Sequence, residues 1–421
     1  MNEINKRPRV RFVGYTDNWE KHELKNLLIE RKILQKISDD APILAFAAGQ
    51  GVIDRSERKS NNRDHLTLDQ VNKYYKLTEY DDIVYNPSNL KYGAIDRNKH
   101  GRGVISPIYV TFTTEEKPSF IELIVKSEKL KLRALQYEEG TVVKRQSVKP
   151  ENLLSLDVNI SSSLNEQTKI GNYFQQLDNL ITLHQRKYDK LLNVKKAMLE
   201  KMFLKKGADM PEIRFKGFSE KWEGRKYSES FTNIPNNTFS RSELNYNFGL
   251  AKNIHYGDIL IKFGELLDIE KEKVPFITNN NLANKLKPLK LQNGDVIIAD
   301  AAEDKTVGKC TELINVRKEI ILSGLHTIPI RPALYFSPKY LGYYMNSSAY
   351  HNQLLPLMQG TKVLSISKSA IQDTSIYFPH LKEQTKIGNL FKNLDKLLTL
   401  QQTQLKKLKN IKKACLEKMF A

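Results

Sequence analysis

Signals for export, membrane insertion and metal binding are largely missing from these 421 residues. No apolar run follows the basic start MNEINKRPRVR, and no stretch approaches the ~18 consecutive apolar residues that a membrane helix needs. Only two cysteines occur, Cys310 and Cys415, and they lack the spacing of a metal site. These absences lead us to expect a cytoplasmic protein in a reducing compartment, with no signal peptide and no membrane partner.

Catalytic motifs are also scarce. No G-x-x-x-x-G-K-[ST] phosphate-binding loop occurs, and the segment NPSN at 86–89 lacks the second proline and the aromatic residue of an adenine methyltransferase motif. Asp295, Glu303 and Lys305 follow the order of a nuclease D…ExK pattern, but such a match arises easily by chance when 27% of residues are charged. We therefore expect no catalytic residues, no cofactor and no metal. An enzyme that modifies or cuts nucleic acid at those carboxylates is the alternative.

The charge, by contrast, is strongly one-sided. Lysine and arginine number 67 against 48 aspartate and glutamate residues, which gives a formal net charge of +19. A soluble protein this basic usually binds a polyanion, although a surface charge that only favours solubility is the simpler alternative. With 40% hydrophobic residues, the chain is long enough to form two domains, each with its own core.

The chain contains a long internal repeat. Residues 165–203 align without a gap on residues 382–420, and we count 25 identical residues among the 39 positions. Both copies open with EQTKIGN, and each is preceded by a shorter landmark: PRVRFVGY with Trp19 corresponds to PEIRFKGF with Trp222. The intervening regions, roughly 21–160 and 224–377, are unlike each other. A duplicated frame therefore holds two different inserts, which suggests two related readers with different targets; drift after an old duplication is the alternative.

The repeated segments are predicted to be long helices that form a coiled-coil seam. From Glu166 to Phe203 there is no proline and one glycine, and SLNE at 163–166 has the pattern of a capping box. Apolar residues recur every three or four positions in both copies. The predicted seam comprises Ile170, Phe174, Leu177, Ile181 and Leu191 in the first copy and Ile387, Phe391, Leu394, Leu398 and Leu408 in the second.

Polar residues interrupt the seam at the same two places in both copies. His184 corresponds to Gln401, and Lys195 corresponds to Lys412. Polar seam positions either fix register and orientation or point to solvent at a frayed contact, and the sequence leaves both interpretations open.

The connection between the two copies predicts the direction of the helices. At ~1.5 Å per residue, a helix of this length spans ~57 Å, too long to be buried in one small domain. Only about ten residues, 204–214, join the first helix to the second landmark. The second variable region must then begin near the far end of the first helix, and the second helix runs back. We predict an antiparallel pair with approximate two-fold symmetry.

Each variable region is predicted to mix helices and strands, with strand candidates at 82–85, 108–112, 295–298 and 327–330. Polar loops that contain glycine, such as 96–103 and 300–309, can approach nucleic acid closely. Arginine and lysine there bind guanine or phosphate and asparagine reads adenine, while an ordinary solvated loop is the alternative for any single side chain. The predicted DNA-contacting residues are Arg55, Arg58, Arg63, Arg97, Lys99 and Arg102 in the first region and Lys252, Asn280, Lys305 and Lys309 in the second.

The ordered set of landmarks, PxxRFxG[FY] followed by tryptophan, a variable region and an EQxKI helix, all written twice, resembles the specificity (S) subunit of type I restriction–modification systems. The resemblance covers nearly the full chain. One departure is that the proline before the second EQ, Pro379, is replaced by Ser162 in the first copy.

This resemblance implies an α+β protein in which two mixed α/β target-recognition domains are separated by a long antiparallel two-helix coiled coil with pseudo-two-fold symmetry. The domains would be 1–160 and 207–377, and the spacer helices 161–206 and 378–421. Each domain would read one half of a split site in double-stranded DNA. Two methyltransferase (M) subunits would dock on the helices, and two restriction (R) subunits would join the complex. A coiled-coil adaptor that ignores DNA is a further alternative.

Overall fold

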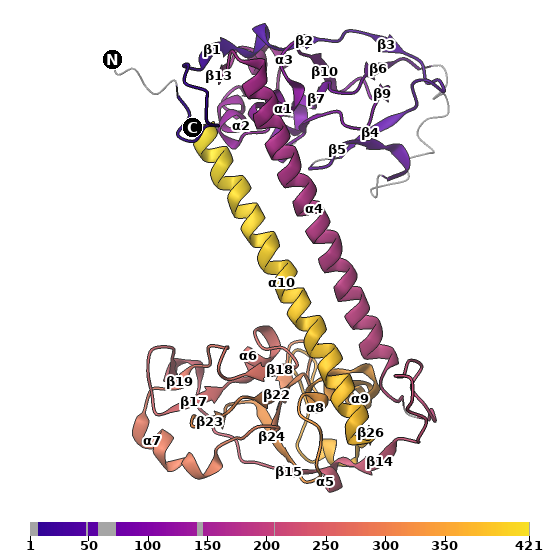
Figure 1. Ribbon diagram of the computed structural model, residues 1–421, viewed down its shortest axis with the longest axis vertical. Coiled ribbons are helices and arrows are strands. Elements are labelled where there is room, and N and C mark those ends of the chain that lie inside the picture. Colours follow the sequence, from indigo (N-terminus) through magenta and orange to yellow (C-terminus); the bar gives the residue numbers. More distant parts are fainter. Residues whose placement is uncertain (1–6, 48, 58–72, 141–145, 206, 421) are drawn as a thin grey trace. The chain divides into compact units, whose positions relative to one another are not determined.

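The structure is a computed structural model that describes residues 7–47, 49–57, 73–140, 146–205 and 207–420. The chain divides into two compact units (Figure 1). Unit 1 consists of residues 1–185 and 403–421, and unit 2 consists of residues 186–402. No helix among the described residues is long and apolar enough to cross a membrane.

Unit 1 is built on small antiparallel sheets. The largest has the order β2-β10-β7-β8 and is formed by Ile29–Glu30, Val110–Thr113, Ile83–Tyr85 and Ile95–Arg97. Beside it are the sheet β3-β6-β9 (Leu34–Gln35, Tyr75–Thr78, Gly103–Ile105) and three two-stranded ladders: β1-β13 (Glu20–Glu23, Asp157–Ile160), β4-β5 (Leu44–Ala47, Gly51–Asp54) and β11-β12 (Glu138–Glu139, Ser147–Val148).

The helices of unit 1 cover one side of its main sheet. These are α1 (Pro118–Val125), α2 (Glu128–Leu135), α3 (Pro150–Leu154) and the first part of α4 (Leu164–Lys201). The apolar faces of strands β7 and β10 and of helices α1 and α4 form one core, in which Phe112, Phe120 and Phe174 are almost completely buried. Burial of such aromatic side chains contributes about 1.5–3 kcal/mol each.

Unit 2 has larger sheets of mixed direction. A five-stranded sheet, β15-β24-β20-β22-β18, joins Phe231–Asn233, Thr327–Pro332, Val296–Ala299, Cys310–Ile314 and Leu266–Asp268, and only the β18–β22 pair is parallel. A four-stranded sheet, β16-β19-β17-β23, joins Leu244–Asn245, Phe276–Ile277, Ala251–Ile254 and Ile320–Ser323. Two ladders complete it: β14-β26 (Glu223–Lys226, Ser375–Phe378) and β21-β25 (Ala301–Ala302, Leu364–Ser365).

The helices of unit 2 are short apart from the repeated segments. They are α5 (Tyr227–Ser230), α6 (Tyr256–Ile261), α7 (Asn280–Lys285), α8 (Tyr340–Asn346) and α9 (Ser348–Leu354), with the start of α10 (Leu381–Met419). Five tyrosines of α5, α8 and α9 are almost completely buried against the five-stranded sheet and α10. The strand predictions at 82–85, 108–112, 295–298 and 327–330 are confirmed within two residues, as β7, β10, β20 and β24.

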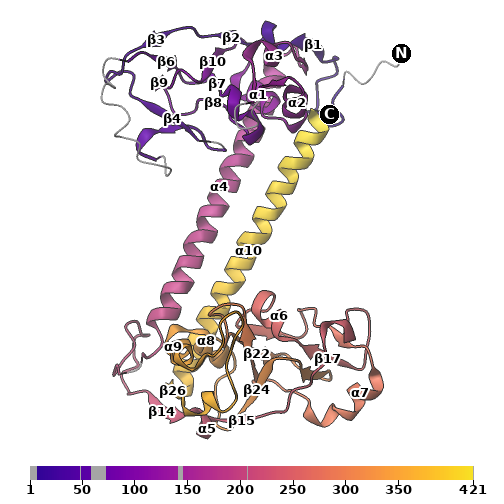
Figure 2. The same cartoon turned by 180° about the vertical axis from the view of Figure 1, so that it is seen from behind.

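Helices α4 and α10 confirm the prediction of two long repeated helices, and they run antiparallel in each unit (Figures 1 and 2). In unit 1 the Tyr173 hydroxyl lies 3.7 Å from the Cys415 sulfur, and Asp178 forms an ion pair with Lys412. In unit 2 the Lys195 ammonium lies 2.6 Å from the Asp395 carboxylate. Residue numbers rise along one helix as they fall along the other, which is the antiparallel direction.

The predicted seam residues differ in burial along the helices. Six near the helix starts are buried, and four farther along the helices are half-buried. The buried members are Ile170, Phe174, Leu177, Ile387, Phe391 and Leu394, and the half-buried members are Ile181, Leu191, Leu398 and Leu408. The polar residues His184 and Gln401 are also half-buried.

The glutamate of the EQTKIG motif attaches each long helix to its landmark. Glu166 accepts hydrogen bonds from the Arg11 guanidinium, at 2.5 and 2.8 Å, and from the Trp19 indole at 3.3 Å. Glu383 likewise accepts two hydrogen bonds from the Arg214 guanidinium, at 2.8 and 2.7 Å. The capping box predicted at 163–166 is therefore wrong in its second half, because the Glu166 carboxylate binds arginine instead of the backbone of its own helix.

The glutamine of the motif ties two backbone segments together. The Gln167 side chain accepts from the Lys117 backbone amide at 3.0 Å and donates to the Ser161 carbonyl at 2.7 Å. Gln384 repeats this with the Ser337 amide at 2.9 Å and the Pro379 carbonyl at 2.8 Å. Each glutamine thereby joins the strand before its own helix to a segment that leads into α1 or α8.

The remaining letters of the motif fit the helix closely onto its unit. Lys169 lies over the Tyr15 ring at 5.0 Å, and Lys386 lies over the Phe218 ring at 4.8 Å, so each lysine contacts the aromatic residue of its landmark. A Cβ atom on Gly171 would lie 2.1 Å from the Ser119 hydroxyl, so glycine permits the close approach of α1 and α4. The repeated sequence thus attaches each long helix to its own unit through equivalent contacts, and we call these contacts the repeated attachment.

Candidate nucleic-acid interface

The basic turn of unit 1 lies between β8 and β9 and is held by Asn98. Its side-chain oxygen accepts from the backbone amides of His100 and Gly101, at 2.9 and 3.1 Å, and its amide donates to Thr78 at 3.0 Å. Asn98 is completely buried, so the turn has a fixed shape. A glycine with φ of +134°, Gly101, completes the reversal.

The three predicted cations of this turn all have acidic partners. Arg97 is 7% exposed, and its guanidinium donates to Glu122 at 2.9 Å and also pairs with Asp81. Lys99 pairs with Glu122 as well, and Arg102 pairs with Glu79 at 2.6 Å. The structure therefore places Arg97 inside the domain, where it supports the turn, while Lys99 and Arg102 lie exposed on its surface.

Glu122 of α1 is the centre of a buried charge network. Burial alone would raise the pKa of its carboxyl, but Lys99, Arg97 and Lys126 outweigh that effect and lower the pKa to about 2. Asp96 lies in the same network, 2.7 Å from Lys126, and burial raises its pKa. The acids offset most of the positive charge of the turn, so the turn alone is not a strongly basic surface.

The other predicted residues of unit 1 lie around the β4–β5 hairpin. Arg55 begins a short 3-10 helix, Arg55–Glu57, and is half-buried, with no hydrogen-bond or ion-pair partner among the residues that the structure describes. Arg58 and Arg63 lie outside the described residues.

The polar loop of unit 2, residues 300–309, contains two lysines, of which only Lys309 has a hydrogen-bond partner among the described residues. Lys305 is exposed and has no side-chain partner within the described parts of the chain. Lys309 is half-buried and donates to the Leu260 carbonyl at 2.9 Å, near the end of α6, and burial lowers its pKa. The structure thus separates the two: Lys305 is available at the surface, and Lys309 holds α6 against the loop.

Lys252 lies on β17 of the four-stranded sheet, and Asn280 lies at the start of α7, which contacts β17. Lys252 on β17 is half-buried, with its ammonium 3.9 Å from Glu319. Asn280 at the start of α7 is exposed, and its side-chain oxygen accepts from the Leu250 amide at 2.8 Å. The two residues are brought together with the β16–β17 loop, whereas Lys305 belongs to a separate loop after β21.

Sequence reasoning missed the β16–β17 loop, which exposes aromatic side chains. Tyr246 and Phe248 are 52% and 77% exposed. The signal was present as the segment NYNFGL at 245–250, in which aromatic residues alternate with turn-forming asparagine and glycine. Turn residues fix a backbone on the surface, so aromatics between them are presented to solvent or to a ligand.

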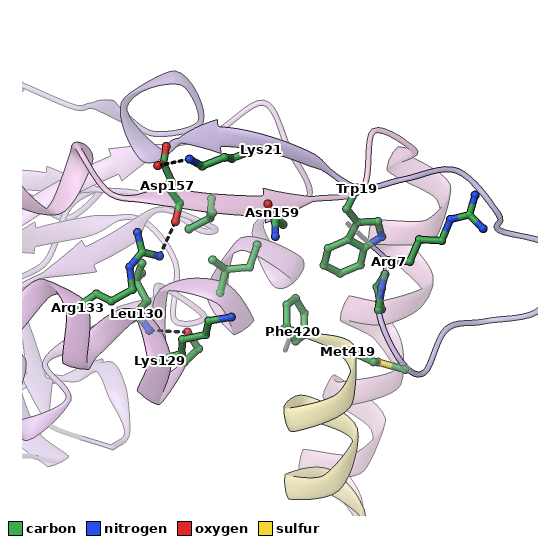
Figure 3. Close-up of a pocket in the computed structure, with 14 residues that line it drawn as sticks. Arg7, Trp19, Lys21, Lys129, Leu130, Arg133, Asp157, Asn159, Met419 and Phe420 are labelled. Carbon is green, nitrogen blue, oxygen red and sulfur yellow. Dashed lines mark hydrogen bonds and ion pairs between the residues drawn. The ribbon is translucent and has the colours of Figure 1, made fainter. Parts of the chain in front are cut away.

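A basic cavity of about 270 Å³ lies in unit 1 where α10 ends (Figure 3). Trp19 and Phe420 form part of its apolar wall. Its rim carries Lys129 together with three cations that have protein partners: Arg7 with the Asn18 side chain, Lys21 with the Asp157 carboxylate and Arg133 with the Asp157 carbonyl. Most of this positive charge is therefore used within the unit.

The residues of the D…ExK pattern have separate structural surroundings. Asp295 is completely buried, and both of its oxygens accept from Arg331, at 2.9 and 2.7 Å, in the turn that enters β20. Glu303 and Lys305 are exposed on the loop after β21. Among the described residues there is no group of three or more His, Cys, Asp or Glu side chains that could hold a metal ion.

Comparisons with known proteins point to one family. Residues 249–410 match the model of the type I restriction modification DNA specificity domain. The chain is 25% identical over 262 residues to the type I restriction enzyme MjaVIII specificity subunit of Methanocaldococcus jannaschii, a match that covers 59% of this chain and 58% of that relative. The type I restriction–modification S subunit from M. genitalium has the same fold, with a TM-score of 0.53, 14% identity and 99% coverage of both chains.

The matched region begins just before β17 and ends within α10, so it includes β17 to β26 and Glu383 and leaves out β15, β16 and Arg214. The order of landmarks that suggested the family from the sequence agrees with these matches. The region 249–410 is thus similar to the type I DNA specificity domain, and the chain is similar to type I restriction–modification specificity subunits.

Proposed function

We propose that this chain reads a bipartite site in double-stranded DNA, with the region 1–160 reading one half-site and the region 207–377 reading the other. The observation that carries the proposal is the repeated attachment of two differently built regions to two equivalent helices. Arg11–Glu166 and Arg214–Glu383 are the same contact, whereas the sheets behind them differ in strand number and direction. A common frame with unlike inserts fits one docking function combined with two recognition functions.

The helices α4 and α10, within 161–206 and 378–421, form the proposed spacer between the half-sites and the docking surface for two methyltransferase subunits, with two restriction subunits joining the complex. Leucines at equivalent positions support a protein-binding surface: Leu180 and Leu397 are each 43% exposed, and Leu183 and Leu400 are 46% and 49% exposed. Apolar side chains that repeat on an exposed helix face favour contact with another protein.

The proposed DNA contacts are those predicted cations and amides that the structure leaves accessible. Lys99, Arg102, Asn280 and Lys305 are exposed, and Arg55 and Lys252 are half-buried. Arg58 and Arg63 stay in the proposal as residues outside the described part of the chain. Arg97 and Lys309 support the loops from within.

We propose that the chain itself is not catalytic. Asp295, which an enzyme of the D…ExK kind would need as a metal ligand, has both oxygens committed to Arg331. Purified chain, assayed alone for methyl transfer and for cleavage of duplex DNA, should show neither activity. Turnover without added subunits would contradict the proposal.

The recognition proposal is tested by selection from a random duplex library with the full chain in complex with its methyltransferase subunits. The expected result is one enriched sequence with two specified blocks separated by unspecified base pairs, and binding that weakens steeply with added salt. Enrichment of a single continuous block, or of no sequence, would contradict it.

A further inference from the structure

The β16–β17 loop of unit 2 presents an aromatic side chain on a rigid support. Asn245 accepts hydrogen bonds from the backbone amides of Asn247 and Phe248, at 2.9 and 3.1 Å, and its own amide donates to Thr278 at 3.3 Å. Asn280 holds the far end of the loop through the Leu250 amide. Phe248 lies between these fixed points and is 77% exposed.

The loop also packs against the sheet below it. It connects β16 and β17, which both pair with β19, so it crosses the end of β19 at Phe276. A Cβ atom on Gly249 would lie 2.6 Å from that of Phe276, so only glycine fits beside the strand. Phe276 itself is half-buried, and Phe248, the residue just before this contact, is held in the exposed part of the loop.

Cations flank the aromatic residues of the loop. The Lys262 ammonium lies 4.9 Å from the centre of the Tyr246 ring, and Ile261 beside it is 90% exposed at the end of α6. The segments 244–257 and 277–290, which meet at the Leu250–Asn280 hydrogen bond, contain no aspartate or glutamate. They contribute four lysines: Lys252, Lys285, Lys287 and Lys290.

These observations favour a polyanion over another protein as the partner of the loop. The two segments combine lysines, asparagines and protruding apolar side chains, and the acid beside Lys252, Glu319, comes from outside them. Lysine, asparagine and apolar side chains are the residue types of proteins that push a wedge between base pairs. In both views of unit 2 the strand β17 lies on the opposite side from α9 and β26 (Figures 1 and 2). The β16–β17 loop, which leads into β17, therefore lies on a different side of unit 2 from α9 and β26.

We propose that Phe248 is a wedge residue that inserts between stacked base pairs of the half-site read by unit 2, while Tyr246 and Lys262 contact the adjoining backbone. This inference rests on the proposed function, because it assumes that unit 2 binds duplex DNA. Insertion of the ring exchanges its exposure to water for stacking against bases, which every base sequence permits. The wedge would therefore contribute affinity and local unstacking, whereas neighbouring side chains would supply sequence preference.

The test compares Phe248→Ala with Tyr335→Ala in the full chain with its methyltransferase subunits. Tyr335 is a matched control because it is also 77% exposed in unit 2 but lies on the segment after β24. The probe is the selected duplex with 2-aminopurine placed at successive steps of one half-site. The wild type should raise the 2-aminopurine fluorescence at one step, and Phe248→Ala should abolish this increase and weaken binding by about 5- to 150-fold.

Three results would separate the possible explanations. Tyr335→Ala should behave as the wild type, and Phe248→Trp should restore both fluorescence and affinity. If Phe248→Ala binds and unstacks the duplex like the wild type, or weakens only assembly with the methyltransferase subunits, the wedge is overturned while the DNA-reading function stands. If the wild type itself selects no duplex, the proposed function fails instead.

Discussion

At the scale of single residues, two buried glutamates have opposite electrostatic surroundings. Glu122 in unit 1 is paired with arginine and lysine, and these cations overcome its burial and lower its pKa to about 2. Glu312 in unit 2 accepts from the backbone amides of Lys339 and Gly342, at 2.6 and 2.9 Å, and burial raises its pKa to about 7. The two units should therefore respond to pH in opposite directions.

Unit 1 should lose stability in acid through Glu122. An unfolded glutamate has a pKa near ~4.3, so the lowered folded pKa stabilises unit 1 above that value, and this contribution is lost as pH falls toward about 2. Glu122→Gln should have a lower free energy of unfolding at neutral pH. As the pH falls from ~4.3 toward about 2, this free energy should decline less steeply in the variant than in the wild type, by up to about 1.4 kcal/mol per pH unit. Denaturant unfolding of a Trp222→Phe background, in which Trp19 reports on unit 1, measures the slope. An unchanged slope would contradict this assignment.

Unit 2 should lose stability as pH rises through Glu312. Its raised folded pKa stabilises unit 2 fully below the unfolded value of ~4.3, and this contribution is lost as pH rises to about 7. Glu312→Gln, which cannot ionise, should remove the decline. Unfolding followed through Trp222 in a Trp19→Phe background between pH 4 and pH 8 provides the measurement. A decline that persists in the variant would assign the effect to another group.

At the scale of elements, the repeat places an equivalent ion pair between the two long helices in each unit, so the two pairs can be compared. Asp178 and Lys412 occupy the same repeat positions as Asp395 and Lys195, and both pairs join α4 to α10. In unit 2, Glu265 also binds Lys195 at 2.8 Å, and the Tyr343 hydroxyl donates to Asp395 at 2.6 Å. The polar seam lysines thus fix helix contacts in both units, but in unit 2 the contact also includes the sheet and α8.

The two ion pairs should differ in coupling energy. The Lys412 and Asp178 side chains are 29% and 40% exposed, so their coupling should be about 0.2–1 kcal/mol. The Lys195 side chain is only 11% exposed, and the pair has two further partners, Glu265 at Lys195 and Tyr343 at Asp395, so a coupling of about 1–3 kcal/mol is expected. Parallel double-mutant cycles with Lys→Met and Asp→Asn substitutions, followed by denaturant unfolding, compare them. Equal couplings would show that Glu265 and Tyr343 add nothing.

Local sequence patterns predicted the long helices and four central strands, because these depend on residue spacing within one segment. The residues that contact the EQTKIG motif were not predictable in this way, because they are distant in the sequence. Glu166, for example, binds Arg11, which lies 155 positions earlier. The basic turn shows the same limit at the candidate site. Its cations were visible in the sequence, but the acid that engages two of them, Glu122, comes from a helix about 20 residues later.

The aromatic loop shows that some site residues could have been found. Phe248 lies between turn-forming residues, a pattern that predicts exposure of its side chain. Short strands such as β2 and β16 have two residues each and no periodicity to detect, so their pairing depends on neighbouring strands. The fold class could thus be inferred from the duplicated landmarks and helices, whereas the contacts of individual side chains required the tertiary structure.

At the scale of the whole molecule, the proposal assigns different tasks to different parts of one chain. The two unlike regions would determine which bases are read, and the helix pair would determine how far apart they are read. A change in helix length should then alter spacing without altering either half-site. This separation of roles is the central claim, and it is independent of which side chains contact the bases.

The most direct measurement is methylation sequencing of cells that express the methyltransferase subunits with a variant shortened in both helices. Deletion of the equivalent segments 183–189 and 400–406 removes ~10 Å of helix, or about three base steps. The account predicts methylation at the same two half-site sequences with an unspecified spacer about three base pairs shorter. Methylation at the original spacing would contradict it, as would a change in the half-site sequences themselves.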